Sequence, residues 1–203
     1  MFHDLKDVTM MLARTWLTHL SAAVLLVLGL APATAAPSET YTSDEIVASG
    51  HKLFGQISGG LATMVEKIVS QYGLPNGYII GQEGSGAFFG GLRYGVGMLY
   101  TRNAGERRVY WQGPSLGFDL GGDSGRTMML VYNLPAAEAL FGEGIHTRFV
   151  GLNGSAYVVG GFGFTAAMYD EMVVVPIRTG FGARLGVNVG YLKFTPDPTW
   201  NPF

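Results

Sequence analysis

The chain carries few residues that could bind a metal or act in catalysis. Beyond residue 35 it has two histidines, His51 and His146, and the whole sequence of 203 residues has no cysteine. A zinc or redox site needs several such ligands at set spacings, so we expect no metal and no cofactor. His146 follows Glu143, and a histidine beside a carboxylate can act as a general base. A surface loop entering a strand accounts for the same residues more simply.

Two short motifs have the letters of known functional loops without the structural context. Residues 84–90 read Gly-Ser-Gly-Ala-Phe-Phe-Gly, which lacks the spacing of a dinucleotide loop and is followed by strand-like residues. Residues 113–117 read Gly-Pro-Ser-Leu-Gly, the letters of a nucleophile elbow. An elbow needs a strand, a turn and a helix, whereas residues 118–120 continue as a strand. We therefore assign no catalytic residue and expect a protein that is not an enzyme.

Two arginines lie among glycines and alternating apolar residues, where a barrel could enclose them. Arg93 and Arg184 would each need a carboxylate partner if enclosed, and Asp119 or Asp123 could supply it. We expect a structural ion pair first and a ligand site second.

Two other charged groups are typical of exposed turns. Residues 169–171, Tyr-Asp-Glu, could bind a cation, and Arg107 with Arg108 could contact an anionic head group. A charged turn between strands and a solvated pair beside a hairpin explain them equally well.

The N-terminal segment has the three parts of a secretory signal peptide. Lys6 and Arg14 precede the apolar residues 22–31, and Ala33-Thr34-Ala35 has the small-x-small pattern of a cleavage site. The apolar run is too short for a membrane-spanning helix, which needs roughly 20 residues. We predict that residues 1–35 are removed after export by the general secretory route. The product would be soluble and periplasmic, and would not span the membrane.

The composition excludes one class of partner and calls for an explanation of the glycines. The net charge is −2, and removing residues 1–35 takes away equal numbers of acids and bases. A nucleic-acid binder would show a basic face and a high pI, so we expect no nucleic-acid partner. The chain has 31 glycines, roughly double the usual share of about 7%, and most lie inside apolar segments.

The hydrophobic pattern predicts one domain over residues 36–203. A helical lead-in over 43–73 begins at the capping box Thr42 to Glu45, carries an apolar stripe and should break near Gly59. Residues 78–195 then alternate with period two, except for a short helix over 133–142, and a proline-rich tail follows over 196–203. The predicted fold is mainly β: a small antiparallel barrel of about eight strands, with an N-terminal amphipathic helix and one short helix between strands. Glycines permit the bends and close approaches of such a barrel.

Three glycine-rich stretches carry a resemblance to a known family. They are Gly-Ser-Gly-Ala-Phe-Phe-Gly-Gly-Leu-Arg-Tyr-Gly at 84–95, Trp-Gln-Gly-Pro-Ser-Leu-Gly-Phe-Asp-Leu-Gly-Gly-Asp at 111–123, and Thr-Gly-Phe-Gly-Ala-Arg-Leu-Gly at 179–186. Together they resemble the envelope integrity protein A (EipA) family. That resemblance implies a soluble periplasmic eight-stranded β-barrel that supports resistance to envelope stress, and it carries over no catalytic residue. A fainter similarity is to the SYLF lipid-binding domain, through the glycines at 113 and 117, residues 128–131 and residues 136–141.

Three hypotheses about function follow. The first is a non-enzymatic periplasmic protein that maintains the cell envelope by binding an unknown envelope component, whether protein, lipid or polysaccharide. The second is a carrier of a lipid or another hydrophobic ligand, which requires an elongated apolar cavity. The third is an outer-membrane barrel, suggested by the terminal Phe203, but Pro196, Pro198 and Pro202 prevent the final strand that this signal needs.

Overall fold

The computed structural model describes residues 39–55, 59–86, 92–102, 104–116, 124–142, 148–153, 157–159, 162–179 and 188–201. These residues form two α-helices, one 3-10 turn and ten strands. The helices are α2 (Ser43–Phe54), α3 (Gly59–Tyr72) and the 3-10 turn η2 (Ala137–Leu140). The strands are β1 (Gly77–Gly86), β2 (Leu92–Thr101), β3 (Gly105–Leu116), β4 (Ser124–Tyr132), β5 (Phe149–Asn153), β6 (Tyr157–Val159), β7 (Phe162–Phe164), β8 (Ala167–Tyr169), β9 (Met172–Thr179) and β10 (Asn188–Thr195). The predicted signal peptide, residues 1–35, lies outside the described residues.

The helical segment divides in two, as the glycines predict. At the start of α2 the Glu45 backbone N–H donates to the Thr42 hydroxyl (3.3 Å), and the Thr42 N–H donates to the Glu45 carboxylate (2.8 Å). This is the predicted capping box, which satisfies donors that the first turn leaves unpaired. The helix ends at Gly55, whose φ of 89° suits a residue without a Cβ. Helix α3 then begins at Gly59. In the described chain, no helix has the length and apolarity needed to cross a bilayer.

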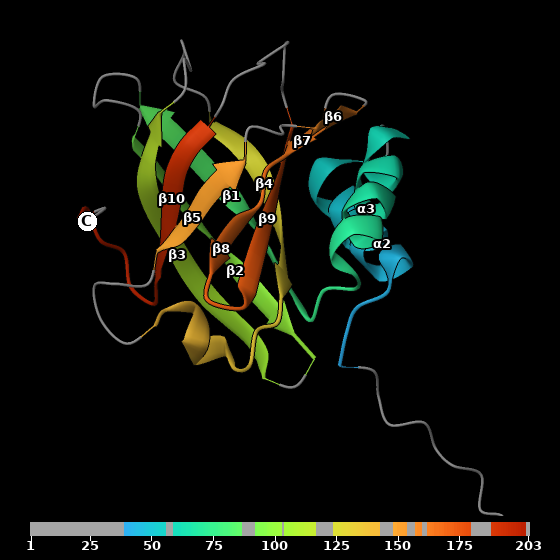
Figure 1. Cartoon of the computed structure of the whole chain (residues 1–203), viewed down its shortest axis with the longest axis horizontal. Coiled ribbons are helices and arrows are strands. Elements are labelled where there is room, and N and C mark those ends of the chain that lie inside the picture. The colour runs from blue at the N-terminus through green and yellow to red at the C-terminus, as the bar shows by residue number, and fades with distance from the viewer. Residues whose placement is uncertain are drawn as a thin grey trace, which may run out of the picture. The chain divides into compact units, whose positions relative to one another are not determined.

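The strands close into an antiparallel barrel, which confirms the predicted fold. Eight of them follow one another around the ring in the order β4-β1-β2-β3-β10-β5-β8-β9, and β9 returns to pair with β4. Strand β7 also pairs with β9, in the same register as β8, and β6 pairs with β7. Figure 1 shows the ring, with α2 and α3 beside it.

The predicted helix over residues 133–142 is only one 3-10 turn, η2, of four residues. The backbone explains the difference, because Asn133 has a φ of 55° and Ala136 is extended. Pro135 has no N–H to donate to a longer helix. The turn lies across the lower end of the barrel in Figure 1. Leu134, Ala137 and Leu140 are buried in the barrel's interior core there.

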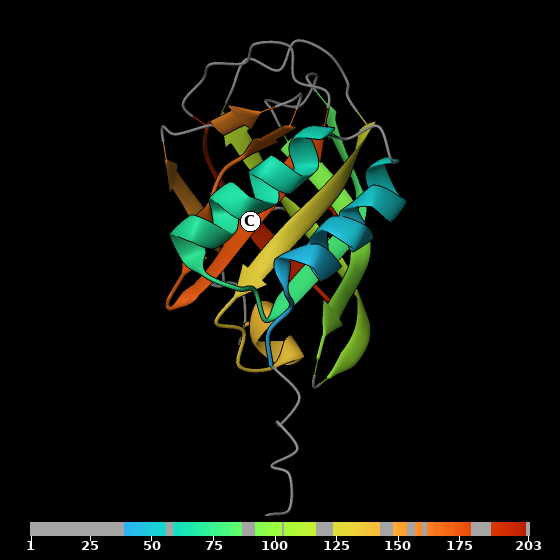
Figure 2. The same cartoon turned by 90° about the vertical axis from the view of Figure 1, so that its right-hand side faces the viewer.

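The barrel wall separates two apolar cores. The interior core fills the lower half of the barrel with side chains that include Val109, Trp111, Phe149 and Phe194. The outer core lies under the helices and is built from alternate residues of β4, β7 and β9. Figure 2 shows α2 and α3 on the outside of the barrel, one on either side of β4. A strand with apolar residues on both faces explains why β4 contains the uninterrupted run Met-Met-Leu-Val.

Gly50 of α2 packs closely against side chains of α3 and β4. A Cβ at this position would lie 2.5 Å from Leu61 Cδ2 and 3.3 Å from Met128 Sδ. We expect Gly50→Leu to lower the free energy of unfolding by about 1–3 kcal/mol, because it overpacks the outer core. The measurement is urea denaturation, with Gly59→Leu as the control, because nothing lies within 4 Å of a Cβ at Gly59. Equal losses in the two variants would contradict this packing.

Candidate functional site

Charged residues enter the interior of the barrel at one end. On β1, Ile79, Gly81 and Glu83 share the inward face, because successive side chains of a strand alternate. The same alternation places Arg93 on the inner face of β2 and Arg178 on the inner face of β9, each at the end of its strand. Strands β1 and β9 end where β2 begins, at the upper end of the barrel in Figure 1. The interior is therefore apolar below and charged above.

Glu83, Arg93, Trp111 and Arg178 form one group of side chains, the interior cluster. Arg178 donates two hydrogen bonds to the Glu83 carboxylate, from Nε to Oε1 (2.9 Å) and from Nη2 to Oε2 (3.1 Å). The Trp111 indole N–H donates to Oε2 (2.8 Å). Arg93 Nη1 lies farther away, 4.0 Å from Oε1. The side chains of Glu83, Arg93 and Arg178 are only 11%, 14% and 17% exposed.

The surroundings of Glu83 hold its carboxyl group in the ionised form. Burial by itself would raise the pKa, but the charges of Arg178 and Arg93 and the hydrogen bonds from Arg178 and Trp111 outweigh it. The pKa falls to about 2. A carboxylate with so low a pKa is a poor general base near neutral pH, where a base poised near 7 works best. The cluster is thus suited to fixed electrostatics and binding.

This pKa predicts a loss of stability in acid. The folded-state pKa of about 2 lies below the ordinary value of 4.5, so the ionised carboxylate stabilises the fold fully above about pH 4.5. That stabilisation disappears as the pH falls from about 4.5 to about 2. We expect the difference in free energy of unfolding between the parent chain and Glu83→Gln to be constant from pH 7 to 5. It should then shrink by about 2 kcal/mol by pH 3. Urea denaturation at each pH measures it, and an equal difference at pH 6 and pH 3 would contradict the assignment.

Two glycines make room for the Trp111 ring inside the barrel. A Cβ at Gly95 would overlap Trp111 Cε2, and a Cβ at Gly81 would lie 2.8 Å from Trp111 Cη2. The indole therefore lies against bare backbone of β1 and β2, with none of the ring exposed. This placement brings the indole N–H to Glu83. The predicted use of glycine for close approach is present here, between a strand and an aromatic side chain.

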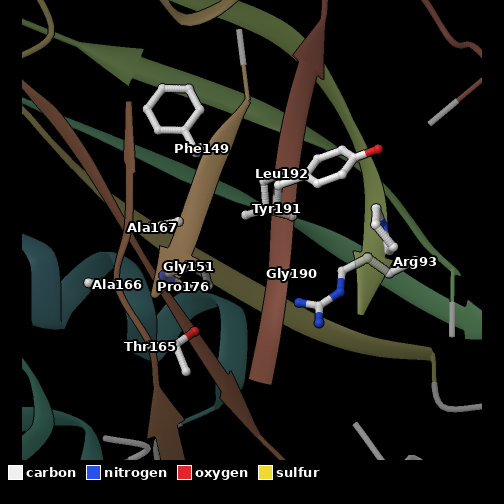
Figure 3. A pocket seen from close by; sticks show the side chains of 11 residues that line it. Arg93, Phe149, Gly151, Thr165, Ala166, Ala167, Pro176, Gly190, Tyr191 and Leu192 are labelled. Atoms are coloured by element: carbon white, nitrogen blue, oxygen red, sulfur yellow. The ribbon is translucent and has the colours of Figure 1, made fainter. Parts of the chain in front are cut away.

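A small cavity lies beside Arg93. Its volume is about 30 Å³, and its walls include Arg93 from β2, Gly151 from β5, Thr165, Pro176 from β9 and Gly190 from β10. Figure 3 shows the Arg93 guanidinium reaching toward the side of the cavity that Thr165 lines. A water molecule needs roughly 10–15 Å³ of such space. The cavity therefore suits a few waters or one small polar group.

Arg93 is the predicted site residue that the structure brings into this cluster. Its predicted partners, Asp119 and Asp123, lie outside the described residues, as does Arg184. The acidic side chain recorded beside it is Glu83. His51 lies in the last turn of α2, and His146 with Glu143 lies outside the described residues. In the described part of the chain, no group of three or more histidines and acids could hold a metal ion.

The remaining motifs lie in ordinary strands and turns. Ser115 lies within β3, where it pairs with Gly190 of β10. Residues 170–171 form the turn between β8 and β9, with a φ of 53° at Asp170. Arg107 forms an ion pair with Glu138 (2.8 Å), which ties β3 to η2, and Arg108 is exposed. Of residues 84–90, the first three belong to β1 and the others lie outside the described residues.

Sequence reasoning missed Glu83 and Arg178. Glu83 could have been found because it lies four residues after Ile79 on the same predicted strand. Side chains an even number of positions apart share a face, so Glu83 places a carboxylate on the apolar face. Arg178 likewise follows the apolar residues 172–177 of a strand that is buried on both faces. Their partnership was not readable, because 95 residues separate the two side chains.

Comparisons with known proteins agree with this architecture. The family described as envelope integrity protein A matches residues 39–203. A crystal structure described as a beta-barrel-like, uncharacterized protein from Brucella abortus is 58% identical, with a TM-score of 0.71. The alignment covers 82% of this chain and all of the Brucella chain. No curated protein matches the chain. The match over the barrel and both helices shows that this chain belongs to the envelope integrity protein A family.

Proposed function

We propose that this chain is a non-enzymatic, soluble protein of the periplasm that supports the integrity of the cell envelope by binding an envelope component. The family match over residues 39–203 is the observation that carries the envelope role. The interior cluster supports binding over catalysis, because its carboxylate is held by Arg178 and Trp111. A group so firmly ionised is not placed to exchange protons near neutral pH.

The leader supports the periplasmic location. Residues 1–35 combine two basic residues, a short apolar run and Ala33-Thr34-Ala35, the pattern of a cleaved export signal. The chain also has no cysteine that could carry a lipid anchor after cleavage. We expect the mature protein in the fraction released by osmotic shock. A cytoplasmic or membrane-bound fraction would contradict this location.

The envelope role is tested by deleting the gene and exposing the cells to detergent and to cell-wall inhibitors. We expect increased sensitivity, restored by the full chain and not by a chain that starts at residue 36, which would stay in the cytoplasm. Unchanged sensitivity of the deletion strain would overturn the proposal. Rescue by the chain without its leader would overturn the periplasmic site of action.

The alternative, a carrier of a lipid or another hydrophobic ligand, needs an elongated apolar cavity. The lower half of the described interior is filled by Trp111, Phe149, Phe194 and the residues of η2, as is usual for small barrels. The cavity beside Arg93 is small and partly polar. These observations favour the first proposal, and native mass spectrometry for co-purified lipid separates the two.

A further inference from the structure

We propose that the outer face of β2, together with Trp200 of the C-terminal tail, binds a flat, β-linked saccharide chain. Tyr94, Val96, Tyr110 and Trp200 form this surface, which we call the outer platform. The inference rests on the proposed binding function and gives the chemistry of the envelope component. Three features carry it: the large side chains outside β2, the fixed and exposed indole of Trp200, and the pairing and charges of the surrounding strands.

Strand β2 carries its large side chains on the outside of the barrel. Gly95 faces the interior, where a Cβ would overlap the ring of Trp111. The alternation along the strand therefore places Tyr94 and Val96 on the outer face. Val96 is 40% exposed, and Tyr110 of β3 lies opposite it in the ladder. The solvated face of an antiparallel sheet is usually polar, so apolar and aromatic side chains here indicate a binding surface.

The C-terminal tail holds Trp200 in a fixed position against β2. After β10 the chain turns back along the barrel wall (Figure 1), and the Thr195 hydroxyl donates to the Asp197 carbonyl (2.8 Å). The Tyr94 hydroxyl donates to the Trp200 carbonyl (3.1 Å), and the centroids of the two rings are 5.5 Å apart. Trp200 is nevertheless 86% exposed. An aromatic ring that is already fixed loses little conformational freedom when a ligand packs on it.

The chemistry of the outer platform suits sugar rings. The face of an aromatic ring is negative and attracts the weakly positive C–H groups on one face of a pyranose. The hydroxyl groups of the sugar then need polar partners at the margin. Gln82 of β1 lies opposite Val96 and is exposed, as are Arg108 and Glu106 of β3. Tyr94 and Val96 are about 7 Å apart along the strand, so the surface is elongated and fits a chain better than a single sugar.

A peptide strand and a lipid bilayer fit this surface less well. Strands β1, β2 and β3 are each paired on both sides, so they offer no edge to which a peptide could add. An anionic bilayer surface attracts clusters of lysine and arginine, whereas the exposed charges on β3 include Glu106 beside Arg107 and Arg108.

A folded protein partner also fits less well. A stable protein interface buries about 800 Å² on each partner and has few charges at its centre. Here the apolar strip is narrow, because Gln82 lies on one side of β2 and Arg108 on the other. A saccharide chain is the ligand that uses both the rings and the polar margin.

The test is calorimetric titration of the protein, expressed with its leader and purified, with β-linked tetrasaccharides of glucose and of N-acetylglucosamine. We expect saturable binding of at least one of them. Iodide quenching gives a second readout, because Trp200 is exposed and Trp111 is buried. A sugar that packs on the indole should protect Trp200 from iodide.

Four variants locate the binding. Trp200→Ala should weaken it about tenfold or more, as expected when an aromatic hot-spot residue is truncated. Trp200→Phe keeps a flat ring and should lie between Trp200→Ala and the parent chain. Tyr94→Phe keeps the ring but removes the hydroxyl that holds the tail, so we expect several-fold weaker binding. Met168→Ala is the matched control, because Met168 is 55% exposed on β8, across the ring of strands from β2. Urea denaturation checks that each variant is folded.

The outcomes separate this inference from the proposed function. No saturable binding of either tetrasaccharide by the parent chain, or equal weakening by Trp200→Ala and Met168→Ala, overturns the saccharide site. Unchanged binding by Tyr94→Phe overturns the role of the fixed tail. Binding to phosphatidylglycerol vesicles that depends on Trp200, without saccharide binding, assigns the surface to a membrane and also overturns the inference. If saccharide binding fails while the deletion strain is sensitive to envelope stress, this inference falls and the proposed function stands. If saccharides bind but the deletion strain is not sensitive, the proposed function falls and the saccharide site stands.

Discussion

Glu83→Gln should lower the free energy of unfolding by about 3–5 kcal/mol at neutral pH, because it removes the only negative charge of the interior cluster. Arg178 would lose both hydrogen bonds to a carboxylate, and two guanidinium groups would remain enclosed near one another. The amide keeps the size of the side chain, so the loss measures charge and not packing. Urea denaturation at pH 7 gives the value.

The matched control is Glu138→Gln, which breaks the ion pair with Arg107 at the other end of the barrel. The Glu138 side chain is 65% exposed, and exposed pairs contribute about 0–1 kcal/mol. The double variant Glu83→Gln/Arg178→Gln should lose less stability than the two single variants lose together. The second change removes a charge that the first change leaves unpaired. A stability of Glu83→Gln equal to that of Glu138→Gln would show that the interior cluster does not stabilise the fold.

Trp111→Ala should also cost about 3–5 kcal/mol, through the cavity that it leaves in the interior core. The ring has no exposed surface and lies against Gly81, Gly95 and Phe194. Its removal also takes away the N–H that donates to Glu83. Chemical denaturation followed by circular dichroism measures the loss, since the tryptophan signal changes with the variant.

Gly95→Ala tests the same packing from the other side. The added Cβ would overlap the indole, and overpacking of this kind costs about 1–3 kcal/mol. In the Trp111→Ala background the added methyl group fills space, so we expect the cost to disappear. Gly84→Ala is the control, because nothing lies within 4 Å of its Cβ. If Gly95→Ala costs as much without the indole as with it, the clash is with the backbone and not with Trp111.

Most of the fold could be predicted from short-range patterns. The capping box of Thr42 and Glu45 and the break in the helical segment near Gly59 depend on neighbours a few residues away. The period-two alternation that begins near Tyr78 gave the strands, and the density of glycine gave a small, tightly curved barrel. The short helix over 133–142 was the exception. A left-handed Asn133 and an extended Ala136 reduce it to one 3-10 turn, and the sequence pattern showed neither.

The site was predicted only in part. Arg93 could be singled out because an arginine among alternating glycines needs a partner if it is enclosed. Its neighbour Glu83 was not chosen, and Arg178 was not considered. The alternation of side chains along a strand fixes which face each one occupies. It does not say which strands become neighbours.

By itself the sequence determined the class of fold, the absence of cysteine and the choice of Arg93 as a residue that a barrel could enclose. The export signal stays a prediction. Those features depend on residue types and on local spacing. Only the tertiary structure decided that Glu83 meets Arg178, that the carboxyl pKa falls to about 2, and that a cavity lies beside Pro176. The physical reason is that closure of the barrel sets the register between distant strands. Electrostatic energies then depend on distances that exist only after closure.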